Sequence, residues 1–271
     1  MKNIFITGVT SYLGKNLLNK LDQHNVYGLI NKTHLDPKKN FVPLNLNLDD
    51  LNLFFNQKGI DTLIHLASNS SGFYEDNIES LVNVNVQLSN KILQATKNST
   101  VKKVIYSGSY LQNVKQNPLN FYSISKQIFE NLLENFTVKN NIQSVSIQFG
   151  DIFGKGDSRD KLIPYLLTNE DKSQVKFKSN GLGCFSPIHI SDATDLIISE
   201  IESPFINKFE KKVGFTKIIS VKEFVHLYKK IRNKSFESIF NTEDPVEEMV
   251  INFQGTYYVP EISLEKSISE L

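Results

Sequence analysis

Residues 4–14 read IFITGVTSYLG, and this stretch decides the fold. Three apolar residues are typical of a short buried strand, a turn with glycines follows, and the four leucines between positions 13 and 21 recur at helical spacing. Gly8 permits a tight turn, Gly14 lets the helix and the strand approach each other, and a helix N-terminus attracts anions. The stretch therefore predicts a strand, a turn and a helix that hold the pyrophosphate of a dinucleotide.

Strand-like runs alternate with helical stretches outward from this turn as far as Gly150. The runs are Ile4–Thr7, Val26–Ile30, Asp61–Leu66, Val104–Ser107 and Gln143–Gln148, and one of the helices between them is expected near Ile78–Thr96. Strands separated by helices favour a parallel sheet that helices cover on both faces. We therefore expect an α/β fold with a Rossmann-type doubly wound parallel sheet, whose ligands lie at the carboxyl ends of the strands.

The pattern changes after Gly150, where glycines, prolines and charges interrupt short elements. This change predicts a dinucleotide-binding Rossmann domain over residues 1–150, with residues 188–216 returning to it. Residues 151–187 and 217–271 would form a small C-terminal substrate-binding lobe.

A second motif combines Tyr122 with Lys126, which would share one face of a helix because they lie four residues apart. Ser109 ends an apolar run thirteen residues before Tyr122. A nearby cation stabilises phenolate, so Lys126 is expected to lower the pKa of Tyr122 from its ordinary value of about 10. With a serine hydroxyl to hold the substrate oxygen, these residues predict a proton-transfer site for alcohol–ketone chemistry. Such chemistry needs a hydride carrier, which the glycine turn would bind.

Composition narrows the class of protein. A net charge of +1 disfavours a nucleic-acid-binding surface, and a single cysteine, Cys184, excludes an internal disulfide and suits a reducing compartment. No apolar run approaches the ~20 residues that span a bilayer, and the N-terminus does not read as a signal peptide. We expect a cytoplasmic protein that binds no membrane. The five histidines lack metal-ligand spacing, so no metal site is expected, and His65 and His189 are interpreted as packing or structural residues.

Seven short motifs together resemble the extended short-chain dehydrogenases/reductases of the NAD-dependent epimerase/dehydratase group. They are TGVTSYLG at 7–14, DTLIHLAS at 61–68, NVNVQLSNKIL at 83–93, YSGS at 106–109, FYSISK at 121–126, SIQFGDIFGKGD at 146–157 and SPIHISDA at 186–193. The resemblance covers nearly the whole chain and implies an enzyme with catalytic Ser109, Tyr122 and Lys126. The cofactor contacts that it implies are Gly8, Thr10, Ser11, Tyr12, Leu13, Asn31, Lys32, Asn47, Leu48, Leu66, Ala67, Ser68, Asn85, Tyr122 and Lys126. The expected substrate contacts are Ser68, Ser109, Tyr110, Asp151, Arg159 and Lys161.

Three departures from the family pattern concern how tightly the dinucleotide binds and which dinucleotide it is. Ser11 stands where the middle glycine is usual, and its Cβ is expected to weaken dinucleotide binding without abolishing it. The acidic residue that usually holds the ribose hydroxyls is replaced by Asn31 and Lys32, which would not repel a 2′-phosphate. We therefore expect NADPH as the cofactor, with NADH as the alternative. Asn47 replaces the first acid of an adenine-contacting motif, and Asp50 in the same motif is equally well a helix cap.

The residues after Ser109 separate the reaction classes. Relatives that dehydrate nucleotide sugars carry an acid/base pair there, whereas this chain has Tyr110 and Leu111, so dehydration is disfavoured. Epimerases of the group retain NAD tightly and keep the acidic ribose anchor that this chain lacks. The resemblance therefore favours a reductase that releases its cofactor after each turnover.

Residues 149–167, FGDIFGKGDSRDKLIPYLL, resemble a pattern of CDP-sugar 4-ketoreductases such as the paratose and abequose synthases. The chain has only two arginines, Arg159 and Arg232. Because a guanidinium grips phosphate oxygens bidentately, Arg159 is expected, with Lys161, at the substrate pyrophosphate, and a surface salt bridge is the alternative. Relatives often have arginine at position 148 and tyrosine at position 153, where this chain has glutamine and phenylalanine, so the identity of the sugar stays open.

These features predict an NAD(P)H-dependent reductase of a nucleotide-linked 4-keto-6-deoxy or 3,6-dideoxy sugar. Its product would be a 4-hydroxy sugar for bacterial polysaccharide biosynthesis, including that of lipopolysaccharide. Two alternatives stay open: an NAD-retaining nucleotide-sugar 4-epimerase, and a sensor that binds the dinucleotide without catalysis. The helices near 78–96 and 120–136 are expected to pair in a homodimer, as the resemblance implies, unless their apolar stripes face the sheet.

Overall fold

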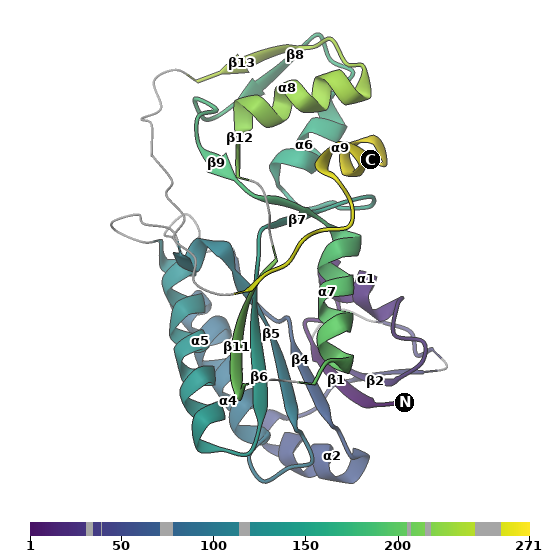
Figure 1. Cartoon of the computed structure of the whole chain (residues 1–271), viewed down its shortest axis with the longest axis vertical. Helices are drawn as coiled ribbons and strands as arrows, with labels where there is room; N and C mark the ends of the chain where they lie inside the picture. The colour runs from purple at the N-terminus through teal and green to yellow at the C-terminus, as the bar shows by residue number, and fades with distance from the viewer. Residues whose placement is uncertain are drawn as a thin grey trace.

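The computed structural model describes residues 1–30, 35–38, 40–70, 78–113, 120–204, 207–214, 218–241 and 256–271. Within these residues, a large lobe with a central sheet carries a smaller lobe at one end (Figure 1). The N-terminus lies in the large lobe and the C-terminus in the smaller one.

The large lobe is built on a sheet of eight described strands. In chain order they are β1 (Asn3–Thr7), β2 (Asn25–Leu29), β3 (Phe41–Leu44), β4 (Thr62–His65), β5 (Lys103–Ser109), β6 (Gln143–Phe149), β11 (Phe209–Gly214) and β14 (Thr256–Tyr257). Their order across the sheet is β14-β11-β6-β5-β4-β1-β2-β3, and all neighbouring strands are parallel. The Rossmann-type doubly wound sheet that the sequence predicts is therefore confirmed.

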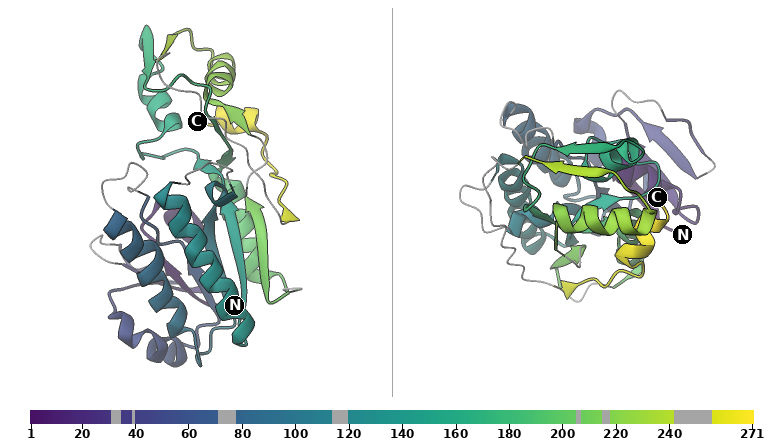
Figure 2. Two further views of the ribbon diagram at one scale, coloured as in Figure 1. Left: turned by 90° about the vertical axis from the view of Figure 1, so that its left-hand side faces the viewer. Right: turned by 90° about the horizontal axis from the view of Figure 1, so that it is seen from above.

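Helices cover both faces of this sheet (Figures 1 and 2). One face carries α1 (Tyr12–Leu18) and α7 (Ile190–Glu202), and the other carries α2 (Leu51–Lys58), α4 (Ser89–Ala95) and α5 (Phe121–Lys139). Because successive strand residues point to opposite faces, Ile4 and Ile6 of β1 lie in the core under α1 and α7, while Phe5 lies in the core under the other helices. None of the helices in the described part of the chain is long and apolar enough to cross a membrane.

The helix expected near 78–96 changes its winding along its length. It begins as α3 (Ile78–Val82), continues as the π-helical segment η3 (Asn83–Leu88) and ends as α4. Widened turns of this kind are frequent at functional sites. Here the widened turn contains Asn85, a buried amide close to the predicted catalytic residues.

The smaller lobe has an apolar core of its own, which includes Leu166, Phe224 and Tyr228. Its elements are α6 (Leu162–Asn169), α8 (Val221–Arg232), α9 (Leu264–Ser269), the strand pair β8 (Gln174–Phe177) with β13 (Glu237–Phe240), and the pair β9 (Cys184–Phe185) with β12 (Ile219–Ser220). Another strand pair, β7 (Asp151–Phe153) with β10 (Pro187–His189), lies where the chain passes between the lobes (Figure 1).

The division of the chain into these lobes stays a prediction, and one strand does not follow it. The sequence places residues 217–271 in the smaller lobe, but β14 pairs with β11 at the edge of the large sheet. This pairing joins residues far apart in sequence, and two residues carry no periodicity from which a strand could be recognised.

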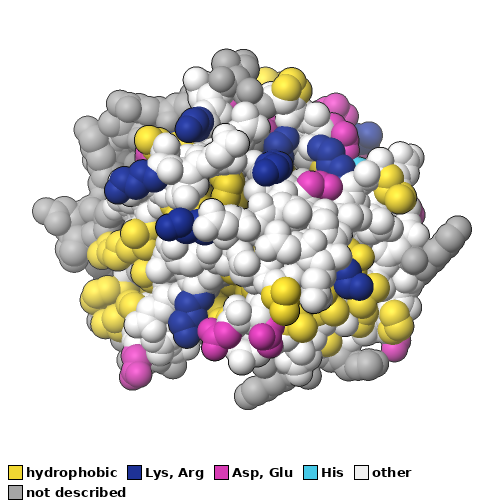
Figure 3. Space-filling view, turned by 90° about the horizontal axis from the view of Figure 1, so that it is seen from below, with side chains coloured by type: hydrophobic (Ala, Val, Ile, Leu, Met, Phe, Trp, Pro, Cys, Tyr) yellow, Lys and Arg dark blue, Asp and Glu magenta, His cyan; other side chains and the backbone are white. Residues whose placement is uncertain are grey.

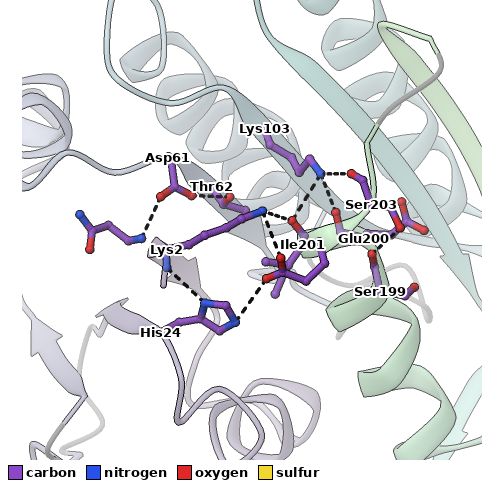
Figure 4. A network of polar contacts seen from close by, with 11 residues as sticks. Lys2, His24, Asp61, Thr62, Lys103, Ser199, Glu200, Ile201 and Ser203 are labelled. Atoms are coloured by element: carbon purple, nitrogen blue, oxygen red, sulfur yellow. Dashed lines mark hydrogen bonds and ion pairs between the residues drawn. The ribbon is translucent and has the colours of Figure 1, made fainter.

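The end of α7 is anchored at the amino ends of the central strands β1 and β5 (Figure 4). Lys103 Nζ, at the start of β5, donates to the carbonyl oxygens of Glu200 and Ser203 at 2.8 and 2.6 Å. Lys2 Nζ, next to β1, donates to the carbonyl oxygen of Ile201. Because the last carbonyls of a helix lack partners and carry partial negative charge, these two ammonium groups hold α7 against the sheet.

Candidate active site

The glycine turn after β1 has the two close approaches that the sequence predicts. Gly8 has a φ of +71°, and a Cβ there would lie 2.6 Å from the backbone nitrogen of Ala67. A Cβ on Gly14 would lie 2.4 Å from the carbonyl oxygen of Gly8. Both distances are too short for a carbon contact, so only glycine fits the turn at position 8 and lets α1 sit against β1 at position 14. The predicted backbone roles of both glycines are confirmed.

The first turn of α1 offers backbone N–H groups to an anion. Half-buried Thr10 precedes the N-cap residue Ser11, whose Oγ accepts a hydrogen bond from the N–H of Gly14 at 3.0 Å. The N–H of Ser11 donates to the carbonyl oxygen of Gly8 at 3.0 Å. Within the residues that the structure describes, the N–H groups of Tyr12 and Leu13 have no partner, as the start of a helix requires. These two donors, beside a glycine backbone that permits close approach, fit a pyrophosphate.

Residues 66–68, which follow β4, lie beside this turn. The N–H of Leu66 donates to the carbonyl oxygen of Thr7 at 3.1 Å, and the N–H of Ala67 donates to Thr7 Oγ1 at 3.3 Å. The turn and this segment thus form adjoining walls at the carboxyl ends of β1 and β4, where a doubly wound fold binds its ligand.

Asn85 fixes the second wall to α5. Its Oδ1 accepts hydrogen bonds from the N–H of Asn69 at 2.7 Å and from the hydroxyl of Ser68 at 3.2 Å. Its Nδ2 donates to the carbonyl oxygen of Asn69 at 2.9 Å and to Ser125 Oγ at 3.0 Å. Because protein groups use both amide donors and the amide oxygen, Asn85 positions Ser68 in this structure rather than offering a free group to a cofactor.

Three hydroxyl groups from three elements meet at Tyr122, in the first turn of α5. The side chains of Ser68, after β4, and Ser109, at the end of β5, both hydrogen-bond the phenol. Ser109 is buried, and its Oγ also accepts the N–H of Leu111 at 3.3 Å. The structure thus brings together the predicted serine and tyrosine, with Ser68 as a third member.

The expected acidic phenol is wrong for this structure. Burial raises the pKa of Tyr122, its hydrogen bonds with Ser68 and Ser109 lower it, and the carboxylate of Asp151 raises it. Burial and the Asp151 charge outweigh the two hydrogen bonds. Tyr122 is therefore a neutral phenol at neutral pH.

Lys126 shares the face of α5 with Tyr122, as predicted, but it binds elsewhere. Its Nζ lies 6.0 Å from the centre of the Tyr122 ring and donates to the carbonyl oxygen of Ser107 at 2.7 Å. Burial lowers the pKa of Lys126 to about 7, with Glu130 acting in the opposite direction. A lysine that is only partly charged at neutral pH gives little stabilisation to a phenolate.

The substrate side of the site contains a chain of three predicted residues. Buried Tyr110 donates from its hydroxyl to Asp151 Oδ2 at 2.9 Å, and Lys161 Nζ lies 3.0 Å from Asp151 Oδ1. Burial raises the pKa of Tyr110 far above its ordinary range, and the bond to Asp151 adds to this. Tyr110 therefore does not supply the acid/base pair of a dehydratase, which agrees with the sequence.

Arg159 does not join this group. Its Nε and Nη2 lie 2.7 Å from the two carboxylate oxygens of Asp157, and its guanidinium carbon lies 4.8 Å from the centre of the Tyr12 ring. The sequence favoured a contact with the substrate pyrophosphate and kept a salt bridge as the alternative, and the alternative is what the structure contains. The partner is a buried carboxylate rather than a surface one, since the Asp157 side chain is only 1% exposed.

Only some of the predicted ribose and adenine contacts belong to the described residues. Asn31 and Lys32 lie outside the described residues. Asn47 is exposed and caps η1 (Leu48–Asp50) by accepting the N–H of Asp49 at 3.3 Å, while Leu48 is half-buried. Asp50 occupies the N-cap position of α2 without making a side-chain cap.

Sequence reasoning missed three residues that hold predicted site residues in place. Gln112 Oε1 accepts the N–H of Ser109 at 2.7 Å, which fixes the end of β5. Asp157 holds Arg159, and Ser125 holds Asn85. Glutamine, aspartate and serine are common on surfaces, so nothing in the local sequence distinguishes these three from solvated side chains.

The assembled groups suit proton transfer at an oxygen beside a dinucleotide site. Unpaired N–H groups fit a pyrophosphate, and a protonated phenol with two serine hydroxyls lies at the ends of neighbouring strands. Among the described residues, no cluster of histidine, cysteine, aspartate and glutamate side chains could hold a metal ion. The fold and this site define a dinucleotide-binding Rossmann protein with a serine, tyrosine and lysine site.

The family can be stated from the match to its model. The chain belongs to the NAD dependent epimerase/dehydratase family, whose model matches residues 4–206. The resemblance based on the seven motifs is therefore confirmed.

Among curated relatives, CDP-abequose synthase of Salmonella typhimurium is 22% identical over 292 residues, covering 99% of this chain and 96% of that protein. The decarboxylating sterol-4-alpha-carboxylate 3-dehydrogenase of Dictyostelium discoideum is 26% identical over 218 residues, covering 72% of this chain and 66% of that protein. A protein of Methanocaldococcus jannaschii is 24% identical over 174 residues, so this chain spans about half of that relative, 56% of its length.

Solved structures with the same fold include MoeE5 in complex with UDP-glucuronic acid and NAD, with a TM-score of 0.83 at 15% identity, covering 99% of this chain and 97% of that one. The UDP-glucose 4-epimerase of Thermotoga maritima with UDP-glucose has a TM-score of 0.80 at 19% identity, covering 98% and 96%. At such identities the likeness shows the fold alone.

Proposed function

We propose that this chain is an NAD(P)H-dependent reductase of a nucleotide-linked 4-keto-6-deoxy or 3,6-dideoxy sugar, and that it forms the 4-hydroxy sugar. The observation that carries the proposal is the phenol of Tyr122, which is hydrogen-bonded by Ser68 and Ser109 and has a raised pKa. Such a phenol holds its proton at neutral pH, as a proton donor to a developing alkoxide must. The similarity to CDP-abequose synthase over 99% of the chain supports the same class of substrate.

The residues have distinct roles in the proposed reaction. NADPH, when bound at the glycine turn, supplies the hydride that reduces the C4 carbonyl. As negative charge develops on the C4 oxygen, Ser109 donates a hydrogen bond to it and Tyr122 transfers its proton, which completes the alcohol. Lys126 would hold the nicotinamide ribose once it leaves the carbonyl of Ser107.

The remaining predicted contacts are divided between the two ligands. The N–H groups of Tyr12 and Leu13 would bind the dinucleotide pyrophosphate, beside the wall formed by residues 66–68. Tyr110, Asp151 and Lys161 would face the sugar nucleotide, since their hydrogen-bonded chain adjoins Tyr122. The preference for NADPH rests on the sequence at Asn31 and Lys32, where a carboxylate is missing.

A second candidate is an NAD-retaining nucleotide-sugar 4-epimerase, since solved structures of this fold include a UDP-glucuronic acid 4-epimerase of Bacillus cereus in complex with NAD. An epimerase first oxidises its sugar, for which the tyrosine must accept a proton as phenolate. The raised pKa of Tyr122 and the weakly charged Lys126 favour the reductase instead.

The protein would act as a homodimer through α5. This helix leaves Phe121, Ile128 and Leu132 exposed, at spacings that place them along one face. Figure 3 shows apolar side chains gathered along its left-hand edge, the side on which α5 lies in Figure 1. An exposed apolar stripe of this kind favours association with a second apolar surface.

The test is an assay of nucleotide-linked 4-keto-6-deoxy sugars for NADPH oxidation, with wild-type protein and Tyr122→Phe. We expect wild-type turnover with at least one sugar, a loss of about 10²–10⁴-fold in kcat for Tyr122→Phe, and little change in the Kd for NADPH. Tyr165→Phe is the matched control, because the Tyr165 hydroxyl donates to the carbonyl oxygen of Lys176 in the smaller lobe, away from the site.

Each outcome separates the candidates. Unchanged turnover in Tyr122→Phe would remove the tyrosine from the mechanism. Stoichiometric NAD in the purified protein, with interconversion of C4 epimers, would favour the epimerase. Dinucleotide binding without turnover of any sugar in the panel would favour the sensor.

A further inference from the structure

The two arginines of the chain make the same kind of cluster in different places. Arg159 makes its two-point pair with Asp157 while lying against the Tyr12 ring. Arg232 pairs with both carboxylate oxygens of Glu170 at 3.1 and 2.9 Å, with its guanidinium carbon 5.8 Å from the centre of the Tyr228 ring. The Arg232 cluster lies wholly within the smaller lobe, whereas the Arg159 cluster joins two parts of the predicted site.

Tyr12, one end of the Arg159 cluster, belongs to the glycine turn. Its backbone N–H is one of the two free donors at the start of α1. Its hydroxyl donates to the carbonyl oxygen of Lys155 at 3.3 Å, and Arg159 Nη2 donates to the carbonyl oxygen of Ile152 at 2.5 Å. Residues 152–159 are therefore folded around the side chain of a residue that lines the dinucleotide site.

The same segment continues at both ends into the predicted substrate site. Asp151 precedes it and accepts from Tyr110, and its charge raises the pKa of Tyr122. Lys161 follows it and pairs with Asp151 at 3.0 Å. One short stretch of chain thus contacts the turn through Arg159 and the reaction site through Asp151.

We infer that the cluster of Tyr12, Asp157 and Arg159 is a clasp that couples the two ligand sites, so that a nucleotide diphosphate strengthens dinucleotide binding and the reverse. The inference rests on the proposed function, because it takes the turn as the dinucleotide site. Because residues 151–161 contact both sites, a ligand that holds this segment in place at one site favours the arrangement that the other ligand binds, and such coupling is reciprocal. Arg159 is then a positioning residue rather than a phosphate ligand. The buried Asp157 carboxylate already pairs with its guanidinium group, so a phosphate would have to displace Asp157.

The experiment measures the Kd for NADPH by titration calorimetry, with and without saturating CDP, and again with UDP. In wild-type protein we expect the better of the two nucleotides to lower the Kd for NADPH by about fivefold or more. Arg159→Lys keeps the charge but loses the planar two-point pair and the ring contact, so the nucleotide should leave the Kd nearly unchanged. Tyr12→Leu keeps the backbone N–H and removes the ring, and it should abolish the coupling in the same way. This second variant tests the clasp if Arg159→Lys does not fold.

Arg232→Lys is the matched control, because it breaks an equivalent pair outside the two sites. It should retain the full coupling while losing stability to a similar extent. Coupling absent from the wild type, or retained in both Arg159→Lys and Tyr12→Leu, would overturn the clasp and leave the proposed function standing. Failure of the wild type to bind NADPH would instead overturn the proposed function, and the clasp with it.

Discussion

At the scale of single residues, the titration of Tyr122 is set by what surrounds the phenol. Burial and the Asp151 carboxylate keep its proton on, and burial leaves the lysine one helical turn away only partly charged at neutral pH. A group of this kind donates a proton readily to an alkoxide, which is a far stronger base than phenolate. The direction of proton transfer thus follows from environment more than from residue type.

His65 shows the same effect of burial and yields a prediction about pH. Its Nδ1 lies 2.7 Å from Thr7 Oγ1 and its Nε2 lies 2.8 Å from Ser89 Oγ, and burial, with Lys126 nearby, lowers its pKa to about 3. In the unfolded chain His65 therefore binds a proton as the pH falls below 6.5, whereas in the folded chain it stays neutral until the pH approaches 3. The stability that neutral His65 contributes is complete above pH 6.5 and is lost as the pH falls toward 3.

We expect wild-type protein to lose about 2 kcal/mol more free energy of unfolding between pH 7.5 and pH 5 than His65→Gln does. Urea denaturation at the two pH values measures this difference. Equal losses in both proteins would contradict a neutral, buried His65.

At the scale of elements, the start of α5 determines the placement of the Tyr122 phenol. Asn120 is the N-cap, and its Oδ1 accepts from both the N–H and the hydroxyl of Ser123 at 2.8 Å. Tyr122 lies in the turn that this cap closes, so the position of the phenol depends on an intact cap.

Asn120→Ala should lower the free energy of unfolding by about 1 kcal/mol and also reduce kcat, because the first turn of α5 loosens. Urea denaturation and the NADPH oxidation assay check the two effects. Ser263→Ala removes the cap of α9, where Ser263 Oγ accepts from the N–H of Lys266 at 3.2 Å, and it should cost similar stability with kcat unchanged. If both variants keep full kcat, the cap does not position Tyr122.

At the scale of the whole molecule, the exposed face of α5 predicts the oligomeric state. We expect wild-type protein to have twice the chain mass of 30.9 kDa in light scattering, and Leu132→Glu to shift it to the monomer, because a buried carboxylate at an apolar contact is costly. Leu53→Glu, at an exposed position on α2, should remain dimeric. A monomeric wild type would rule out this interface.

The lobes also show which parts of the architecture could be predicted. The five strands expected from the sequence are present as β1, β2, β4, β5 and β6, and each contributes apolar side chains to the core. No apolar run indicated β3, an edge strand whose Pro43 lacks a donor for the sheet, or β14, which has two residues. Such elements form because a neighbouring strand is already in place.

The sequence by itself determined the features that depend on short-range geometry. The glycines at 8 and 14 follow from steric limits on the turn, the two-sided burial of β1 follows from strand alternation, and the shared face of Tyr122 and Lys126 follows from helical spacing. Tertiary structure alone decided the charges and the burial: the protonated phenol, the partly charged lysine, and the burial of the Asp157 carboxylate that pairs with Arg159. Burial depends on what packs against a side chain from distant parts of the chain, and local spacing carries no record of it.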